Sequence, residues 1–218
     1  MSSSILNNTI FGAYEIFGNL IPGTIVLTTI ISFAGFSLEA NLANSTLIPS
    51  DFIILFLIFL SYVLGVAIQG IAAKIEMLIY KWVKNYPSKV LLTNENKTFP
   101  DSFKQKVKNV AIQKFGVTDN DPPQHIFDLC YTFLIDRKVS TRVVSFLNLF
   151  NFSRNIMTTM WIEALILFLW SAVSKNLLIA LSALLCIVLS YVFYLRFQAY
   201  GESFAKEVFR SFLVNEAS

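Results

Sequence analysis

The sequence predicts an all-α, polytopic integral membrane protein with four transmembrane helices and a helical cytoplasmic insert between the second and third spans. Hydrophobic residues make up 55% of the 218 residues and charged residues only 14%, a surplus of apolar side chains that one water-soluble domain does not easily bury. Long charge-free runs match the thickness of a bilayer, and the basic residues lie almost entirely on one side of them. We find no alternating pattern typical of strands.

Four apolar segments account for the predicted spans. Residues 52–73 and 177–195 contain twenty-two and nineteen residues without a charge, and a helix needs about twenty residues to cross the hydrocarbon core. Residues 156–173 form a third span that carries one carboxylate, Glu163. Residues 20–36 form a shorter first span. Because the first fourteen residues have no basic n-region, we expect this span to act as an uncleaved anchor.

The basic residues set the expected orientation, because lysine and arginine accumulate in cytoplasmic loops. Sixteen of the seventeen lie in residues 74–155 or in residues 196–218, and only Lys175 lies in the turn between spans three and four. Residues 37–51, between spans one and two, contain two carboxylates and no basic residue. We therefore expect both termini and the long insert on the cytoplasmic side.

This topology divides the chain into an interfacial segment with spans one and two (1–73), the insert (74–155), spans three and four (156–195) and an amphipathic tail (196–218). The insert and the tail contain amphipathic helical patterns whose apolar residues share one face. Examples are Phe103, Val107, Phe127, Leu134, Phe204, Val208 and Phe212. Because these helices have too few apolar residues for separate cores, we expect one small bundle at the membrane face.

Polar groups in and beside the spans are expected to form a layer in the cytoplasmic half of the membrane. A carboxylate exposed to lipid at the bilayer centre costs about 2.5 to 3.5 kcal/mol, so Glu163 should face the other helices. We expect it to hydrogen-bond with Gln69, Asn19 or Tyr191. Two roles stay open, polar contacts that hold helices together and a ligand- or ion-responsive site that opens to the cytosol. The layer comprises Glu15, Asn19, Gln69, Glu163 and Tyr191.

A helix break is predicted at Pro22 and Gly23, between the interfacial segment and the first span. Proline has no amide hydrogen, so the carbonyl of Gly18 loses its helical donor and can join the polar layer. The second span carries a stripe of small residues that allows another helix to approach closely. Such a contact could form within the subunit or between copies, and we favour self-association. The stripe consists of Ser61, Gly65, Gly70 and Ala73.

No catalytic, cofactor or metal motif is recognisable. His125 is the one histidine, which argues against the usual zinc sites. Cys130 lies in the insert and Cys186 in span four, so the two thiols are expected to be free and to serve packing. An intramembrane enzyme needs several convergent acid, base or metal groups, and one glutamate is too few. We therefore expect a non-enzymatic protein without a cofactor.

The first half of the insert is expected to present a basic cytosolic surface. Attraction to anionic lipid headgroups, worth about 1 kcal/mol per basic residue near the surface, explains it. Contact with a nucleic acid or an acidic protein is the alternative. Because the topology alone predicts a basic insert, we do not expect direct nucleic-acid binding. The surface comprises Lys104, Lys106, Lys108 and Lys114.

Three segments carry a resemblance to known proteins: "YEIFGNLIPG" at the first span, "FLNLFNFSRNI" before the third and "YLRFQAYGESFAKEVFRSFL" after the fourth. They resemble small four-span bacterial membrane proteins of anti-phage defence loci, among them the membrane subunits of Kiwa systems. The resemblance implies a multi-pass protein of the bacterial inner membrane that oligomerises, senses membrane perturbation and holds a cytosolic effector partner. No individual functional residue is matched by it.

A signal-gated pore that disrupts the membrane is the competing class. A conductive path normally needs polar lining through the whole bilayer, whereas the polar groups of this sequence stop in the cytoplasmic half. That argues against a pore through one subunit, although it leaves a pore between subunits open.

Overall fold

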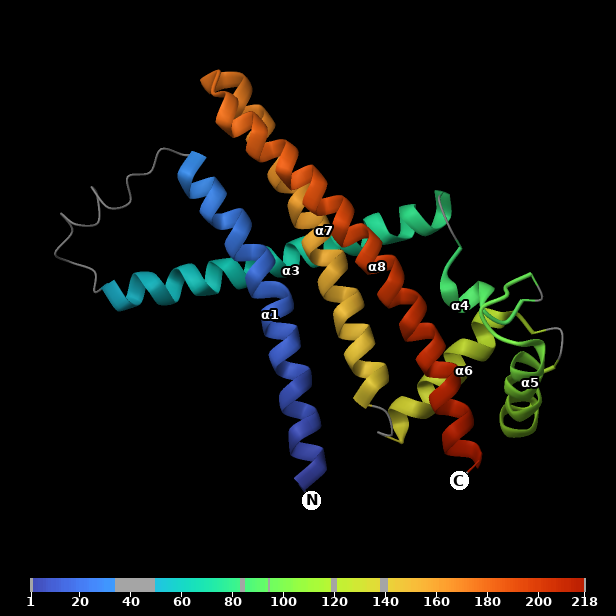
Figure 1. Cartoon of the computed structure of the whole chain (residues 1–218). Coiled ribbons are helices and arrows are strands. Elements are labelled where there is room, and N and C mark those ends of the chain that lie inside the picture. The colour runs from blue at the N-terminus through green and yellow to red at the C-terminus, as the bar shows by residue number, and fades with distance from the viewer. Residues whose placement is uncertain are drawn as a thin grey trace. The chain divides into compact units, whose positions relative to one another are not determined.

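The computed structural model describes residues 2–33, 50–82, 85–93, 95–118, 121–137 and 141–217; for residues 2–15, 17, 33, 50 and 217 it describes only the backbone. All regular structure within these ranges is helical (Figure 1), so the prediction of an all-α protein is confirmed. The helices are α1 (Ser2–Phe33), α3 (Ser50–Trp82), α4 (Pro87–Val90), α5 (Asp101–Phe115), α6 (Pro123–Asp136), α7 (Thr141–Ser174) and α8 (Leu177–Ala217).

Three of the described helices, α3, α7 and α8, are long and apolar enough to cross a membrane. Large apolar side chains on them are exposed, as lipid-facing residues are; examples are Phe52, Leu55, Leu169, Leu177 and Leu185. In α1 the apolar stretch covers only Gly18–Ser32. The fourth span and the cytoplasmic placement of the insert therefore stay predictions, and residues 34–49 lie outside the described part.

The chain folds into two compact units. Unit 1 comprises Met1–Glu76 and Asn151–Arg196, and unit 2 comprises Met77–Phe150 and Phe197–Ser218. The division of the chain into spans, a cytoplasmic insert and a tail stays a prediction. Helices α3, α7 and α8 each contribute residues to both units.

In unit 1, α1 and α3 touch backbone to backbone where they cross (Figure 1). A Cβ atom on Gly23 would overlap the carbonyl of Ser61, and one on Gly65 would overlap the carbonyl of Asn19. Only glycine permits this approach. The Ser61–Gly65 part of the small-residue stripe thus serves a contact within the subunit, whereas a Cβ atom on Gly70 would meet no atom of another element within 4 Å.

The predicted helix break at Pro22 and Gly23 is wrong. Helix α1 (Ser2–Phe33) continues through both residues. Proline removes one helical hydrogen bond, but its fixed φ is compatible with a helix when a neighbouring group takes over the freed carbonyl. Gly23 is needed for the helix crossing, so its presence does not mark a break.

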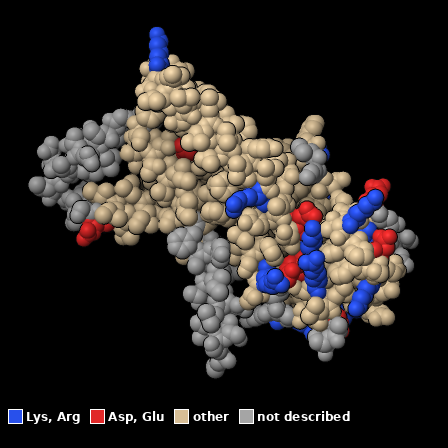
Figure 2. Space-filling view, viewed as in Figure 1, with Lys and Arg blue, Asp and Glu red and all other residues tan. Residues whose placement is uncertain are grey.

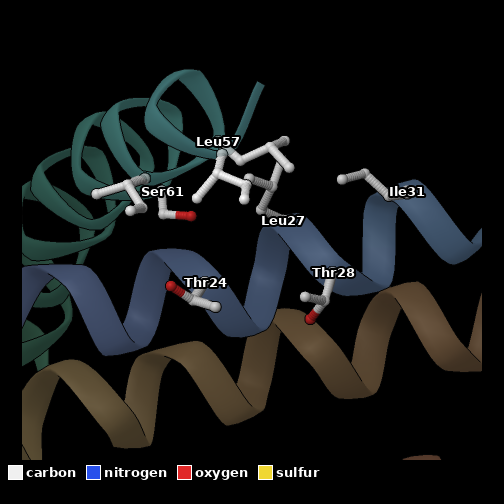
Figure 3. A pocket seen from close by; sticks show the side chains of 8 residues that line it. Thr24, Leu27, Thr28, Ile31, Leu57 and Ser61 are labelled. Atoms are coloured by element: carbon white, nitrogen blue, oxygen red, sulfur yellow. The ribbon is translucent and has the colours of Figure 1, made fainter. Parts of the chain in front are cut away.

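Beside this crossing, α1 and α3 leave a crevice of about 230 Å³ (Figure 3). The hydroxyls of Thr24 and Thr28 donate to carbonyls of their own helix, those of Leu20 and Ile25, each at 2.8 Å. These two threonines therefore have no hydrogen left to offer a ligand. The remaining lining is aliphatic except for Ser61 and consists of Leu27, Ile31, Ile54, Leu57 and Ile58.

Unit 2 is organised around one hydrophobic core that the insert and the tail share. Aromatic rings from α6 and the end of α8 pack against each other: Phe127 lies 5.7 Å from Phe209, and Phe133 lies 5.7 Å from Phe212, centroid to centroid. The Lys114 ammonium of α5 pairs with Glu216 of α8 at 3.0 Å. Figure 2 shows most charged side chains gathered over this unit.

Lys104 corrects the predicted basic surface, because it is buried with only 4% of its surface exposed. Its ammonium donates to the carbonyl of Asn96 at 2.5 Å and to Asp101 at 3.0 Å. No side chain caps the start of α5, so the Lys104 ammonium instead ties the preceding loop to the first turn. Lys106 is exposed and Lys108 half-buried, and neither forms an ion pair with another described residue.

We predict that Cys130 stays unreactive towards a maleimide at pH 8 while the protein is folded. Burial raises the pKa of the thiol to about 12, so at pH 8 it remains protonated, and only the thiolate is a good nucleophile. The test uses Cys186→Ser, which leaves Cys130 as the one thiol, and follows labelling by mass spectrometry. Rapid labelling before unfolding in SDS would contradict the buried position.

We predict that Gly65→Ala destabilises the protein by about 1 to 3 kcal/mol, the usual range for overpacking. The new methyl group meets the main chain of Asn19, which cannot rotate away. Gly70→Ala is the matched control, because a methyl group there meets nothing within 4 Å. The midpoint of thermal unfolding in detergent measures both. An equal effect of the two changes would refute the crossing.

Candidate functional site: a buried polar cluster on α7

The most completely enclosed segment of unit 1 is residues 153–160 of α7, which are all buried. Eight consecutive residues cover more than two helical turns, so neighbouring elements surround α7 on every side at this level. The segment reads SRNIMTTM and is unusually polar for an enclosed helix. Its hydrogen-bonding groups must therefore find partners on other helices or on the α7 backbone.

The first contact is an ion pair between Arg154 of α7 and Glu76 of α3. The guanidinium Nη1 lies 2.5 Å from the carboxylate oxygen, and the two side chains are only 10% and 13% exposed. Removing two charges from water is costly, and the mutual attraction offsets that cost only at close range. The Nε of Arg154 has no hydrogen-bond partner among the described residues.

The second contact joins α7 to α1 at the proline. The amide Nδ2 of Asn155 donates to the carbonyl of Gly18 at 3.3 Å, the carbonyl that Pro22 leaves without its helical donor. The expected free carbonyl is thus bonded to a residue that the sequence argument had not selected. The Oδ1 of Asn155 is buried without a described partner, and Asn19, the residue that follows Gly18 in α1, is buried.

Hydroxyl groups occupy the next turn of α7. Thr159 donates to the carbonyl of Asn155 at 2.9 Å, and Ser190 of α8 donates to the carbonyl of Met157 at 3.1 Å. Thr158 is completely buried, and its hydroxyl has no partner among the described residues. The cluster therefore includes α8 as well as α1 and α3.

Glu163 lies at the end of this polar segment and is buried, with 3% of its surface exposed. Thr29 of α1 is the side chain that interacts with its carboxyl group, and its carboxyl oxygen Oε1 is buried without a described partner. None of the described hydrogen bonds joins Glu163 to Gln69, Asn19 or Tyr191. Its burial agrees with the prediction that Glu163 faces the other helices. The side chain that it meets, Thr29, was not among the predicted partners.

The other predicted members of the polar layer are less buried or lie outside the described part of the chain. Gln69 is half-buried, and Tyr191 is 61% exposed, its ring stacked on Tyr194 at 6.3 Å between centroids. Tyr191 therefore lies outside the enclosed cluster. The side chain of Glu15 is outside the described part of the chain.

Most members of the cluster were not selected from the sequence. One signal could have found part of it: Asn155, Thr159 and Glu163 follow one another at intervals of four, which places them on one face of a helix. The Arg154–Glu76 pair has no such local signal, because its members are 78 residues apart. The missed residues are Thr29, Glu76, Arg154, Asn155, Thr158 and Thr159.

Within the described residues, no group of three His, Cys, Asp or Glu side chains could hold a metal ion. The cluster contains two carboxyl groups, one of them already paired with an arginine. The polar side chains of the cluster join helices α1, α3, α7 and α8. Several of their buried polar atoms have no hydrogen-bond partner among the described residues. A rearrangement of the helices could complete those bonds.

We predict that Glu76→Gln and Arg154→Gln each destabilise the protein by about 3 to 5 kcal/mol, because each leaves a buried charge unpaired. The double variant should lose less than the sum of the two. Unfolding in detergent measures all three. Glu202→Gln is the control: its pair with Lys206 at 2.7 Å is partly exposed and joins neighbouring turns of one helix, so the change should cost less than about 1 kcal/mol. Additive losses in the double variant would exclude the pair.

Neither a protein-family model, a curated protein nor a solved structure matches this chain. The function is therefore argued from the geometry of unit 1 and unit 2 and from the sequence resemblance.

Proposed function

We propose that this protein is a non-enzymatic membrane subunit that senses a change in the bilayer and anchors a cytosolic effector partner. The observation that carries the proposal is the incompletely bonded polar cluster on α7. Four buried polar atoms in it lack a described partner: Nε of Arg154, Oδ1 of Asn155, Oγ1 of Thr158 and Oε1 of Glu163. Each such atom in a dry environment costs free energy.

An incompletely bonded cluster supports sensing because it gives two packing states similar free energies. A second arrangement that bonds more of these atoms would gain back part of the cost, and the helices would have to shift to reach it. A change in bilayer tension or thickness that favours one arrangement would then shift the population. Ionisable groups inside membranes are by default candidates for such roles.

The helices around the cluster also give it a route to a partner. Helices α3, α7 and α8 contribute residues to unit 1 and continue into unit 2. The charged side chains gather over unit 2 (Figure 2), and Lys106 and Lys108 have no ion-pair partner among the described residues. In the proposal, unit 2 is cytosolic and its surface holds the effector.

The extent of the cluster favours a sensor over a pore. Its polar side chains on α7 end at Glu163, and no charged residue follows up to the end of the helix at Ser174. A conductive pore would need polar side chains to continue along the part of α7 between Glu163 and Ser174. Homo-oligomerisation, the bacterial inner membrane and the anti-phage setting enter the proposal from the sequence resemblance alone.

Glu163→Gln is the decisive variant, because it keeps the shape of the side chain and removes the ionisable group. We predict that full-length Glu163→Gln, expressed with its neighbouring genes, still folds and still co-purifies a cytosolic partner in mild detergent. Protection against phage should fall by about tenfold or more, because an amide in place of the carboxyl changes the bonds that each packing state can make and shifts the balance between the two states. Plating efficiency measures protection. Glu95→Gln is the control, since Glu95 is exposed in unit 2.

Three outcomes would contradict the proposal. Full protection by Glu163→Gln would reduce the carboxyl to a structural contact. The absence of any stoichiometric cytosolic partner from the wild-type preparation would remove the anchoring role. Depolarisation of cells by the wild-type chain expressed alone, followed with a potential-sensitive dye, would favour the pore.

A further inference from the structure

A small cleft in unit 2 combines basic, amide and aromatic groups just after the charge-free part of α3. It has a volume of about 310 Å³ and lies where α3 ends and the chain turns towards α4. We propose that it binds the phosphate-bearing headgroup of an anionic phospholipid. The lining residues are Met77, Tyr80, Lys81, Asn85, Tyr86 and Lys89.

The chemistry of the lining suits an anion. Lys81 and Lys89 bring two ammonium groups, and the described lining contains no carboxylate to neutralise them. The Lys89 ammonium lies 5.5 Å from the centre of the Tyr86 ring, and that ring stacks on Tyr80 at 4.1 Å. An ammonium donates three hydrogen bonds and the Asn85 amide donates two, which matches the several acceptor oxygens of a phosphate.

The position along α3 selects a lipid as the source of that phosphate. Met77 follows the last residue of the charge-free run, Ala73, by four residues, or about 6 Å of helix. The headgroup layer on each side of a bilayer is about 5 to 8 Å thick. The cleft therefore begins at the depth where phosphate groups are concentrated.

Three apolar side chains in or beside the cleft are exposed. Met77, Leu78 and Trp82 are 57%, 56% and 78% exposed, and tryptophan is enriched where hydrocarbon meets headgroups. A lipid covers such side chains with its glycerol and upper acyl groups. A nucleic acid or an acidic protein segment would satisfy the two lysines but would leave these apolar side chains in water.

This inference rests on the membrane insertion of α3 and is independent of sensing and of any partner. Lipid binding can therefore be tested on the purified chain, where a failure of the proposed sensor function has no effect. Conversely, a chain that binds no lipid at the cleft could still sense through the α7 cluster.

The test is native mass spectrometry of the full-length protein in detergent, titrated with phosphatidylglycerol or with phosphatidylcholine. We expect tighter binding of phosphatidylglycerol, and about thirty-fold weaker binding of it by Lys81→Gln/Lys89→Gln, because each basic residue contributes separately. Lys97→Gln/Arg137→Gln removes the same charge at two other exposed positions of unit 2 and should bind as wild type does. Lys81→Arg/Lys89→Arg keeps both charges and should retain most of the affinity.

Several results would overturn the site. Equal losses in the two glutamine variants would mean that only net charge matters, and unchanged binding by Lys81→Gln/Lys89→Gln would leave the cleft without a role. Equal affinity for the two lipids would remove the need for an anion. Displacement of phosphatidylglycerol by millimolar inorganic phosphate, or stronger competition by a short DNA duplex, would assign the lysines to a soluble anion or a nucleic acid.

Discussion

Hydrogen bonding without water is the constraint on which the packing of unit 1 depends. An enclosed polar segment in a membrane helix can find donors and acceptors only on its own backbone or on its neighbours. Residues 153–160 of α7 are such a segment, and α1, α3 and α8 each supply one bond to it or to its continuation. The polar residues thereby specify which helices lie against α7 and at which level.

Close backbone contact is the second device that holds unit 1 together. Where α1 crosses α3, the glycines at 23 and 65 bring main-chain atoms together, and small residues at a crossing replace the hydrophobic driving force that lipid removes. The proline next to this crossing frees a carbonyl, and Asn155 bonds to it. The proline, the glycines and the asparagine thus act together at one place, although they come from separate parts of the sequence.

Unit 2 is stabilised in a different way. Its core is rich in aromatic side chains, and Phe127 alone lies in edge-to-face contact with Phe204 and Phe209. Aromatic side chains bury large apolar areas, and their edge-to-face contacts add to the stability of the core. One buried polar group of unit 2 fixes a loop to a helix: the Lys104 ammonium of α5 donates a hydrogen bond to the carbonyl of Asn96. The two units therefore differ in what holds them together: polar contacts and close backbone approach in unit 1, and packing of aromatic side chains in unit 2.

The sequence by itself determined the helical class and the apolar helices long enough to cross a membrane, because run length and periodicity are local properties. It also identified Glu163 as an enclosed carboxyl and Gly18 as a carbonyl in need of a donor. Only the tertiary structure decided that Thr29 and Asn155 meet these groups, that Glu76 pairs with Arg154 and that Lys104 is buried. Those contacts join residues on different helices or beyond a turn, and no local pattern records which side chains a fold will bring together.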